Sequence, residues 1–123
     1  MNDYFLEVHE NFIDFRGKCT VQQLQVLINK SVGFLGADSG PAHIAASTNA
    51  AMSIFYTCAD DSCRKPLRGT GEFFPIIPEV ECYGCLTRSP IARPGYFCER
   101  QDNLCTRAFD VSALKKQLVQ FFS

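Results

Sequence analysis

The stretch "VGFLGADSGPAHIAAS", Val32–Ser47, constrains the fold of this chain more than any other part of its sequence. A short apolar run ends at Ala37 and is followed by a carboxylate, Asp38. A run of this length bounded by turn residues is typical of a buried strand in a parallel sheet. Pro41 has a fixed φ that favours the first turn of a helix. The stretch therefore predicts a strand, a turn and a helix of an α/β protein.

The neighbouring segments extend this unit in both directions. Residues 11–15 alternate apolar and polar side chains and predict a strand. Thr20 and Gln23 have the spacing of a capping box, which predicts a helix over the following ten residues. Residues 31–37 are apolar on both faces and predict a central strand, and residues 51–57 predict a third strand. This order predicts an α/β fold, a three-layer Rossmann-like half-domain with a short parallel sheet.

The second half of the chain has a different character. Residues 58–107 contain five prolines and six of the seven cysteines, and hydrophobic periodicity is lost there. We expect a Cys-rich loop segment, because long irregular segments in compact domains are usually functional or held by something other than a core. Residues 110–122 recover an apolar stripe and predict a C-terminal helix capped by Asp110 or Ser112. Residues 1–123 are thus expected to form one domain, with 11–57 as its α/β unit.

Charge and hydropathy exclude several classes of protein. The formal net charge is −1, with 12 basic and 13 acidic residues, so nothing favours binding to nucleic acid or to an anionic membrane. No stretch reaches the roughly 18 apolar residues of a membrane span. The first residues carry acids and lack a basic start followed by an apolar core, so they do not resemble a signal peptide. The sequence therefore predicts a cytoplasmic protein.

The turn after the apolar run is the first candidate site. Ligands of parallel α/β sheets bind beyond the carboxyl ends of strands, at the starts of the following helices. The N–H groups near Gly40, Ala42 and His43 are expected to be free and to suit a diphosphate. Asp38 is expected to accept hydrogen bonds from sugar hydroxyls or to orient His43. From the residues alone, a helix start with no ligand remains an open alternative.

The cysteines form the second candidate site. A C-x2-C pair is followed after twelve residues by a C-x6-C pair, and four thiolates at about 2.3 Å from a metal suit zinc or iron. The alternatives are reduced, partly buried thiols and a pair of disulfides. Cys58 and Cys63 are possible substitute ligands. The predicted metal ligands are Cys82, Cys85, Cys98 and Cys105.

Residues 11–57 resemble the C-terminal domain of family nine glycosyltransferases, the bacterial heptosyltransferases. The motifs that carry the resemblance are "GKCT", residues 17–20, and "DSGPAHIAA", residues 38–46. The resemblance implies a GT-B glycosyltransferase whose loop holds the diphosphate and sugar of an ADP-heptose-like donor. Carried over by position, Ser39, Gly40 and Pro41 form the phosphate turn, Asp38 contacts the sugar, and His43 supports the loop or the phosphate.

The chain departs from the family's two-domain arrangement. It has no counterpart of the acceptor-binding N-terminal domain with its catalytic carboxylate, so we assign no catalytic residue. The resemblance implies the donor-binding part of an enzyme of lipopolysaccharide or cell-surface glycan synthesis, located in the cytoplasm or peripheral to the inner membrane. We expect it to be inactive alone, with the N-terminal domain supplied by another chain. The alternative is a metal-stabilised α/β binding module without transferase activity. A cysteine segment before the last helix is frequent in the family, and one branch holds iron with four cysteines.

Overall fold

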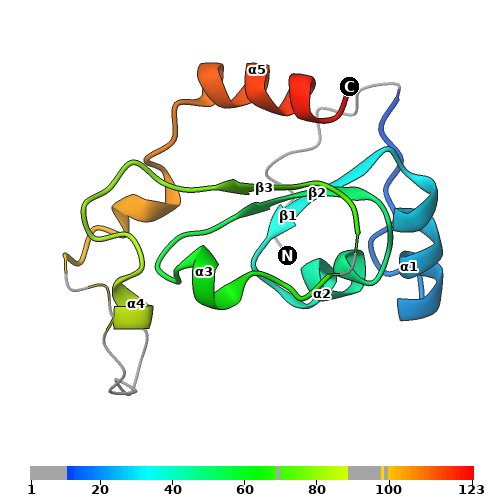
Figure 1. The fold of residues 1–123 in the computed structure, drawn as a ribbon, viewed down its shortest axis with the longest axis horizontal. Coiled ribbons are helices and arrows are strands. Elements are labelled where there is room, and N and C mark those ends of the chain that lie inside the picture. Colours follow the sequence, from blue (N-terminus) through cyan, green and yellow to red (C-terminus); the bar gives the residue numbers. More distant parts are fainter. Residues whose placement is uncertain (1–10, 69, 89–97, 99) are drawn as a thin grey trace.

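A computed structural model describes residues 11–68, 70–88, 98 and 100–123. Three strands, β1 (Gly33–Ala37), β2 (Ala51–Phe55) and β3 (Phe73–Ile76), form a parallel sheet in the order β1-β2-β3 (Figure 1). The described helices are α1 (Val21–Lys30), α2 (Gly40–Ala46), α3 (Asp61–Arg64), α4 (Cys85–Arg88), the 3₁₀ helix η1 (Leu104–Thr106) and α5 (Val111–Phe121). The predicted α/β class is confirmed, and the sheet with its helices has the form of a Rossmann-like half-domain.

Helix α1 begins where the sequence predicts it. The Gln23 N–H donates to Thr20 Oγ1 at 3.2 Å, and the Thr20 N–H donates to Gln23 Oε1 at 2.8 Å. This reciprocal pair is the predicted capping box. The apolar side chains of this helix are only partly buried, since Ile28 is 5% exposed whereas Val21 is 63% exposed. The helix therefore depends on its cap as well as on packing.

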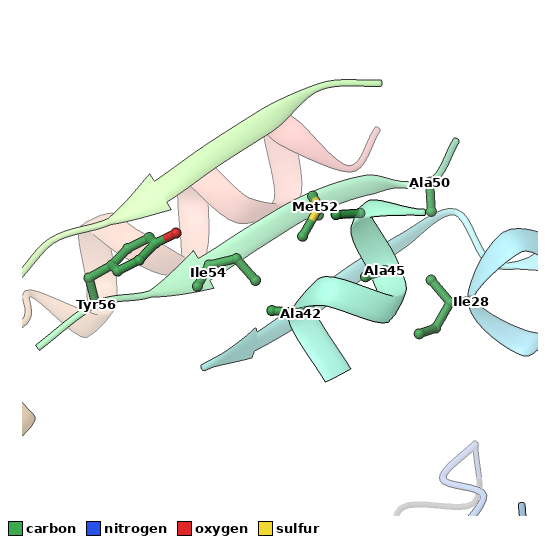
Figure 2. Close-up of a cluster of buried hydrophobic side chains, with 8 residues drawn as sticks. Ile28, Ala42, Ala45, Ala50, Met52, Ile54 and Tyr56 are labelled. Atoms are coloured by element: carbon green, nitrogen blue, oxygen red, sulfur yellow. The ribbon is translucent and has the colours of Figure 1, made fainter. Parts of the chain in front are cut away.

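The hydrophobic core lies between β2 and α2. Met52, Ile54 and Tyr56 are fully buried at 0% exposure, and alternation along the strand places them on one face of the sheet (Figure 2). Ala42 and Ala45 of α2 are also 0% exposed against this row. Because alanine has a small side chain, the backbone of α2 lies close to the sheet. This helix directly follows the turn after β1.

Helix α5 covers the opposite face of the sheet (Figure 1). A Cβ built on Gly33 would lie 2.1 Å from the Phe122 ring, so that glycine makes room for the aromatic side chain. The rings of Phe74 and Phe121 are 5.6 Å apart. Asp110 Oδ1 accepts from two backbone amides and caps α5, as one of the two predicted caps. The sheet thus lies between α2 and α5, which is the predicted three-layer arrangement.

The strand predicted for residues 11–15 does not form. Phe12 and Ile13 are 50% and 70% exposed, and the segment is irregular. Asp14 accepts the Arg16 N–H at 2.9 Å and also binds its guanidinium, which favours a local turn. A strand also needs a neighbour for its ladder hydrogen bonds, and no strand of the described sheet pairs with this segment. The prediction for this segment was wrong.

Two further predictions about the sheet are corrected. The strand of residues 31–37 was expected at the centre, but β1 is an edge strand and Leu35 is 49% exposed. The central strand is β2, which pairs on both sides. Strand β3 forms inside the segment predicted as a loop, and it contains Pro75, which an edge strand tolerates. Residues 89–97 and 99 of that loop lie outside the described residues.

Candidate functional site

The residues of the predicted donor site follow β1 without interruption. Asp38 is half-buried directly after the strand, Ser39 is the N-cap, and α2 begins at Gly40. Ser39, Gly40, Pro41 and His43 are all exposed. This junction is at the carboxyl edge of a parallel sheet, the edge at which such sheets bind ligands. The fold therefore leaves the turn accessible to solvent.

The hydrogen bonds of the turn differ from the expectation in one respect. The Ala42 N–H donates to Ser39 O at 3.0 Å, so the expectation that this amide is free is wrong. Pro41 has no N–H, and α2 has only seven residues. The Ser39 hydroxyl donates its one proton to Ala37 O at 3.1 Å, so it must rotate away from that carbonyl to donate to an anion. An anion here would meet one hydroxyl, the Gly40 amide and the His43 ring rather than a row of free amides.

Gly40 is not required by packing. A Cβ built on it meets no atom within 4 Å, and its φ is not in the left-handed region. Glycine at the start of a helix is less favourable than alanine by about 1 kcal/mol or less. Its presence is consistent with close approach of a ligand to the backbone.

Sequence reasoning did not find Tyr56, which lies beside the turn. The Asp38 N–H donates to Phe55 O at 3.2 Å, which continues the β1–β2 ladder past the end of both strands. Tyr56 is 0% exposed, and its hydroxyl has no hydrogen-bond partner among the residues that the structure describes. Burial raises the pKa of Tyr56 to about 12, and the charges of Asp38 and Asp61 add to this. The period-two alternation with Ile54 is the signal that would have placed Tyr56 on the α2 face.

A second tyrosine joins α3 to the segment before α4. The Tyr83 hydroxyl accepts the Asp61 N–H and donates to Asp61 Oδ1, each at 2.8 Å. Burial is the main cause that raises the pKa of Tyr83 to about 12. The Asp60 N–H donates to Thr87 Oγ1 at 2.9 Å. These bonds hold the turn of the first cysteine pair against the end of β2.

The structure brings the four predicted cysteine ligands into one neighbourhood, together with Cys58. Burial is the main cause that raises the pKa of Cys85, and the nearby thiols of Cys58 and Cys82 raise it further. The pKa of Cys105 is raised by burial and by the same two thiols. Backbone amides, that of Asn103 first, lower the pKa of Cys98. Gly84 has a φ of 73° in the turn between the first pair.

The cysteine neighbourhood does not have the geometry of a bound metal. All seven cysteines are free thiols in the structure, so neither of the alternative disulfides is present. Within residues 11–68, 70–88, 98 and 100–123, no three His, Cys, Asp or Glu side chains lie close enough to hold an ion. Thiolate side chains nevertheless have the right chemistry for zinc or iron.

A surface pocket of about 540 Å³ lies at the opposite end of α2. Its basic side chain is already bonded to the protein backbone. Arg68 is its one basic lining residue, and the guanidinium donates to Thr70 O, Glu72 O and Ala50 O. Burial lowers the pKa of Arg68. The residues that line the pocket are Ala46, Ser47, Thr48, Asn49, Leu67, Arg68 and Thr70. This pocket is therefore separate from the turn at Asp38.

The fold and the turn define a Rossmann-like α/β protein, and comparison with known families gives a narrower assignment. The model of glycosyltransferase family 9 (heptosyltransferase) matches residues 5–70, more than half of the 123 residues. The chain belongs to this family, as the resemblance in its sequence indicated. Comparisons with curated proteins and with solved structures gave no match. None of the described helices is long and apolar enough to cross a bilayer.

Proposed function

We propose that this chain is the donor-binding part of a glycosyltransferase and takes an ADP-heptose-like nucleotide sugar at the turn after β1. Family membership supports a transferase-related role. The observation that carries the proposal is the exposed Ser39–Gly40 turn, next to half-buried Asp38, at the carboxyl edge of the sheet. The turn residues of the family's DSGPAHIAA motif, Ser39, Gly40 and Pro41, are therefore accessible.

Each polar group of the turn has a defined chemical task in this proposal. Phosphate oxygens accept hydrogen bonds from the Gly40 N–H and from the Ser39 hydroxyl, which rotates away from Ala37 O when the donor binds, and the His43 ring adds a third donor. The Asp38 carboxylate accepts a hydrogen bond from a sugar hydroxyl, because an ionised carboxylate is an acceptor only. Pro41 fixes the backbone direction at the start of α2. The turn binds and orients the donor but holds no group that activates an acceptor.

Transfer requires a second binding surface. Catalysis needs acceptor and donor held in one geometry, and positioning of this kind contributes several kcal/mol, up to about 11, to lowering the barrier. We propose that an N-terminal GT-B domain on another chain supplies the acceptor site and the catalytic carboxylate. The chain is then inactive alone, acts in lipopolysaccharide or cell-surface glycan synthesis, and works in the cytoplasm or at the inner membrane surface.

An NMR titration with ADP-glucose tests donor binding. At millimolar ligand we expect amide shifts at residues 39–43 that saturate. Gly40→Ala should weaken this response at least about fivefold, because a methyl group occupies the approach to the backbone. Its free energy of unfolding should be unchanged or higher by up to about 1 kcal/mol.

Ser47→Ala, at the other end of α2, is the matched control. The Ser47 hydroxyl bonds Ile44 O and Gln25, so its loss touches the same helix but not the turn. The titration should be unchanged in this variant. Absence of any response in the wild-type chain would exclude the donor site and favour a binding module without transferase activity.

We also propose that the cysteine neighbourhood holds a structural zinc or iron ion. The support is the convergence of Cys58 and the four predicted ligands, with backbone amides directed at the Cys98 thiol. A bound metal would order an irregular segment that has little core of its own. Elemental analysis should find about one ion per chain, lost in Cys82→Ser and kept in Cys63→Ser, whose thiol is exposed. Metal-free protein from metal-supplemented growth would exclude the site.

A further inference from the structure

We propose that Tyr56 is a positioning residue for the donor site, because its hydroxyl hydrogen-bonds the Asp38 carboxylate when a sugar nucleotide is bound. This inference rests on the proposed function, since it assigns a partner to the carboxylate that contacts the sugar. Tyr56 itself touches no ligand, because its side chain is fully buried.

The register of the sheet brings the two residues together. Gly36 pairs with Ile54 and Ala37 with Phe55, and the Asp38 N–H still bonds Phe55 O. The next pair along the ladder is therefore Asp38 with Tyr56. Directly paired residues on neighbouring strands project to the same face, with Cβ atoms about 5 Å apart. Both side chains are thus on the α2 face, and Figure 2 shows Tyr56 at the end of the core row.

In this conformation, the hydroxyl of Tyr56 has no hydrogen-bond partner among the described residues. It is a buried oxygen with no hydrogen bond, in a chain whose buried hydroxyls at Ser53 and Thr48 are both bonded. Leaving such a group unpaired is unfavourable, and buried polar groups in native proteins are nearly always paired. A hydroxyl of this kind indicates a conformation in which an acceptor reaches it.

Asp38 is the acceptor best placed to move. The other nearby carboxylate, Asp61, is already fixed by the Tyr83 hydroxyl through both its N–H and its Oδ1. Among the described residues, Asp38 makes a backbone hydrogen bond to Phe55 O and no side-chain hydrogen bond, and it is half-buried at the mouth of the turn. One carboxylate oxygen can accept from Tyr56 while the other accepts from a sugar hydroxyl. Tyr56 thereby orients Asp38 toward the sugar and leaves the diphosphate contacts unchanged.

The variant Tyr56→Phe separates this role from a structural one. It keeps the ring and deletes only the oxygen, so the thermal midpoint of the free protein should be unchanged or higher. Affinity for ADP-glucose, measured from the amide shifts at residues 39–43, should fall about tenfold, as expected for loss of a hydrogen bond to a charged group. Affinity for ADP, which lacks the glucose that Asp38 would contact, should stay the same.

Tyr83→Phe is the matched control. It removes a hydroxyl that makes two hydrogen bonds, so the midpoint should fall while ADP-glucose affinity is kept. If Tyr56→Phe binds ADP-glucose like the wild type, or loses ADP and ADP-glucose equally, the positioning role is wrong and the donor site stands. If the wild-type chain responds to neither ligand, the proposed function fails and this inference fails with it.

Discussion

Residues 20–56 of the α/β unit and the cysteine segment, residues 58–107, are ordered by different interactions. Eight buried apolar residues form one cluster in the α/β unit, from Ile28 to Tyr56. Among the described residues of the cysteine segment, the buried ones are small or isolated: Ala59, Pro66, Ile76, Pro78 and Gly84. The cysteine segment is held mainly by hydrogen bonds between side chains and backbone, such as those that Thr87 and Tyr83 accept. The same short chain thus combines a packed core with a region held by individual polar contacts.

This difference predicts different kinds of opening. Apolar burial contributes roughly 25 cal/mol per Å² and is shared by all members of a cluster, so the α/β unit should unfold as a whole. A hydrogen bond contributes about 1 kcal/mol and acts locally. The part of the cysteine segment outside β3 should therefore open locally while the sheet stays folded. Three experiments test this comparison.

The largest effect is expected in the core. Ile54→Ala should lower the free energy of unfolding by about 2–5 kcal/mol, because Ile54 is 0% exposed and its truncation leaves a cavity. Ile13→Ala is the matched control; Ile13 is 70% exposed, and its loss should cost less than about 0.5 kcal/mol. Urea denaturation measures both. Equal destabilisation by the two variants would contradict the position of the core.

A smaller and local effect is expected from Tyr83→Phe. Loss of two hydrogen bonds to Asp61 should cost about 1–2 kcal/mol, since one bonded group stays partly buried and unpaired. Hydrogen exchange should accelerate at Leu86, whose N–H bonds Cys58 O, but not at Met52 in β2. Equal acceleration at both amides would show that the two regions unfold together.

The smallest effect is expected from alkaline pH. Folding raises the pKa of Tyr56 and Tyr83 to about 12, whereas an unfolded tyrosine ionises near 10. The folded state binds these protons more tightly, so their contribution to stability is fully present below pH 10 and is lost as the pH rises toward 12. Unfolding followed from pH 9 to 12 should show this decline, and each Tyr→Phe variant should flatten it. A flat wild-type profile would mean that neither hydroxyl is sequestered.

Local chemistry made part of the fold predictable. The Thr20–Gln23 capping box, the Pro41 helix start and the Asp110 cap depend on residues within one helical turn, and all three form. The strand of residues 11–15 was predicted from an equally local pattern and is absent. A cap needs only its own helix, whereas a strand needs a neighbour.

The candidate site follows the same division. The motif at residues 38–46 indicated the turn, and the fold places that turn at the carboxyl edge of the sheet. The hydrogen bond that occupies the Ala42 amide was not predictable, because the motif does not specify the geometry of the first turn.

By itself, the sequence determined where α1, α2 and α5 start, the α/β order and the family, because these depend on neighbours along the chain. Only the tertiary structure decided that β2 is central, that Tyr56 lies beside Asp38, and that five cysteines share one neighbourhood. These contacts bring together residues that lie up to several tens of positions apart in the sequence. Sheet register and packing set such contacts, and both arise only when the whole chain is folded.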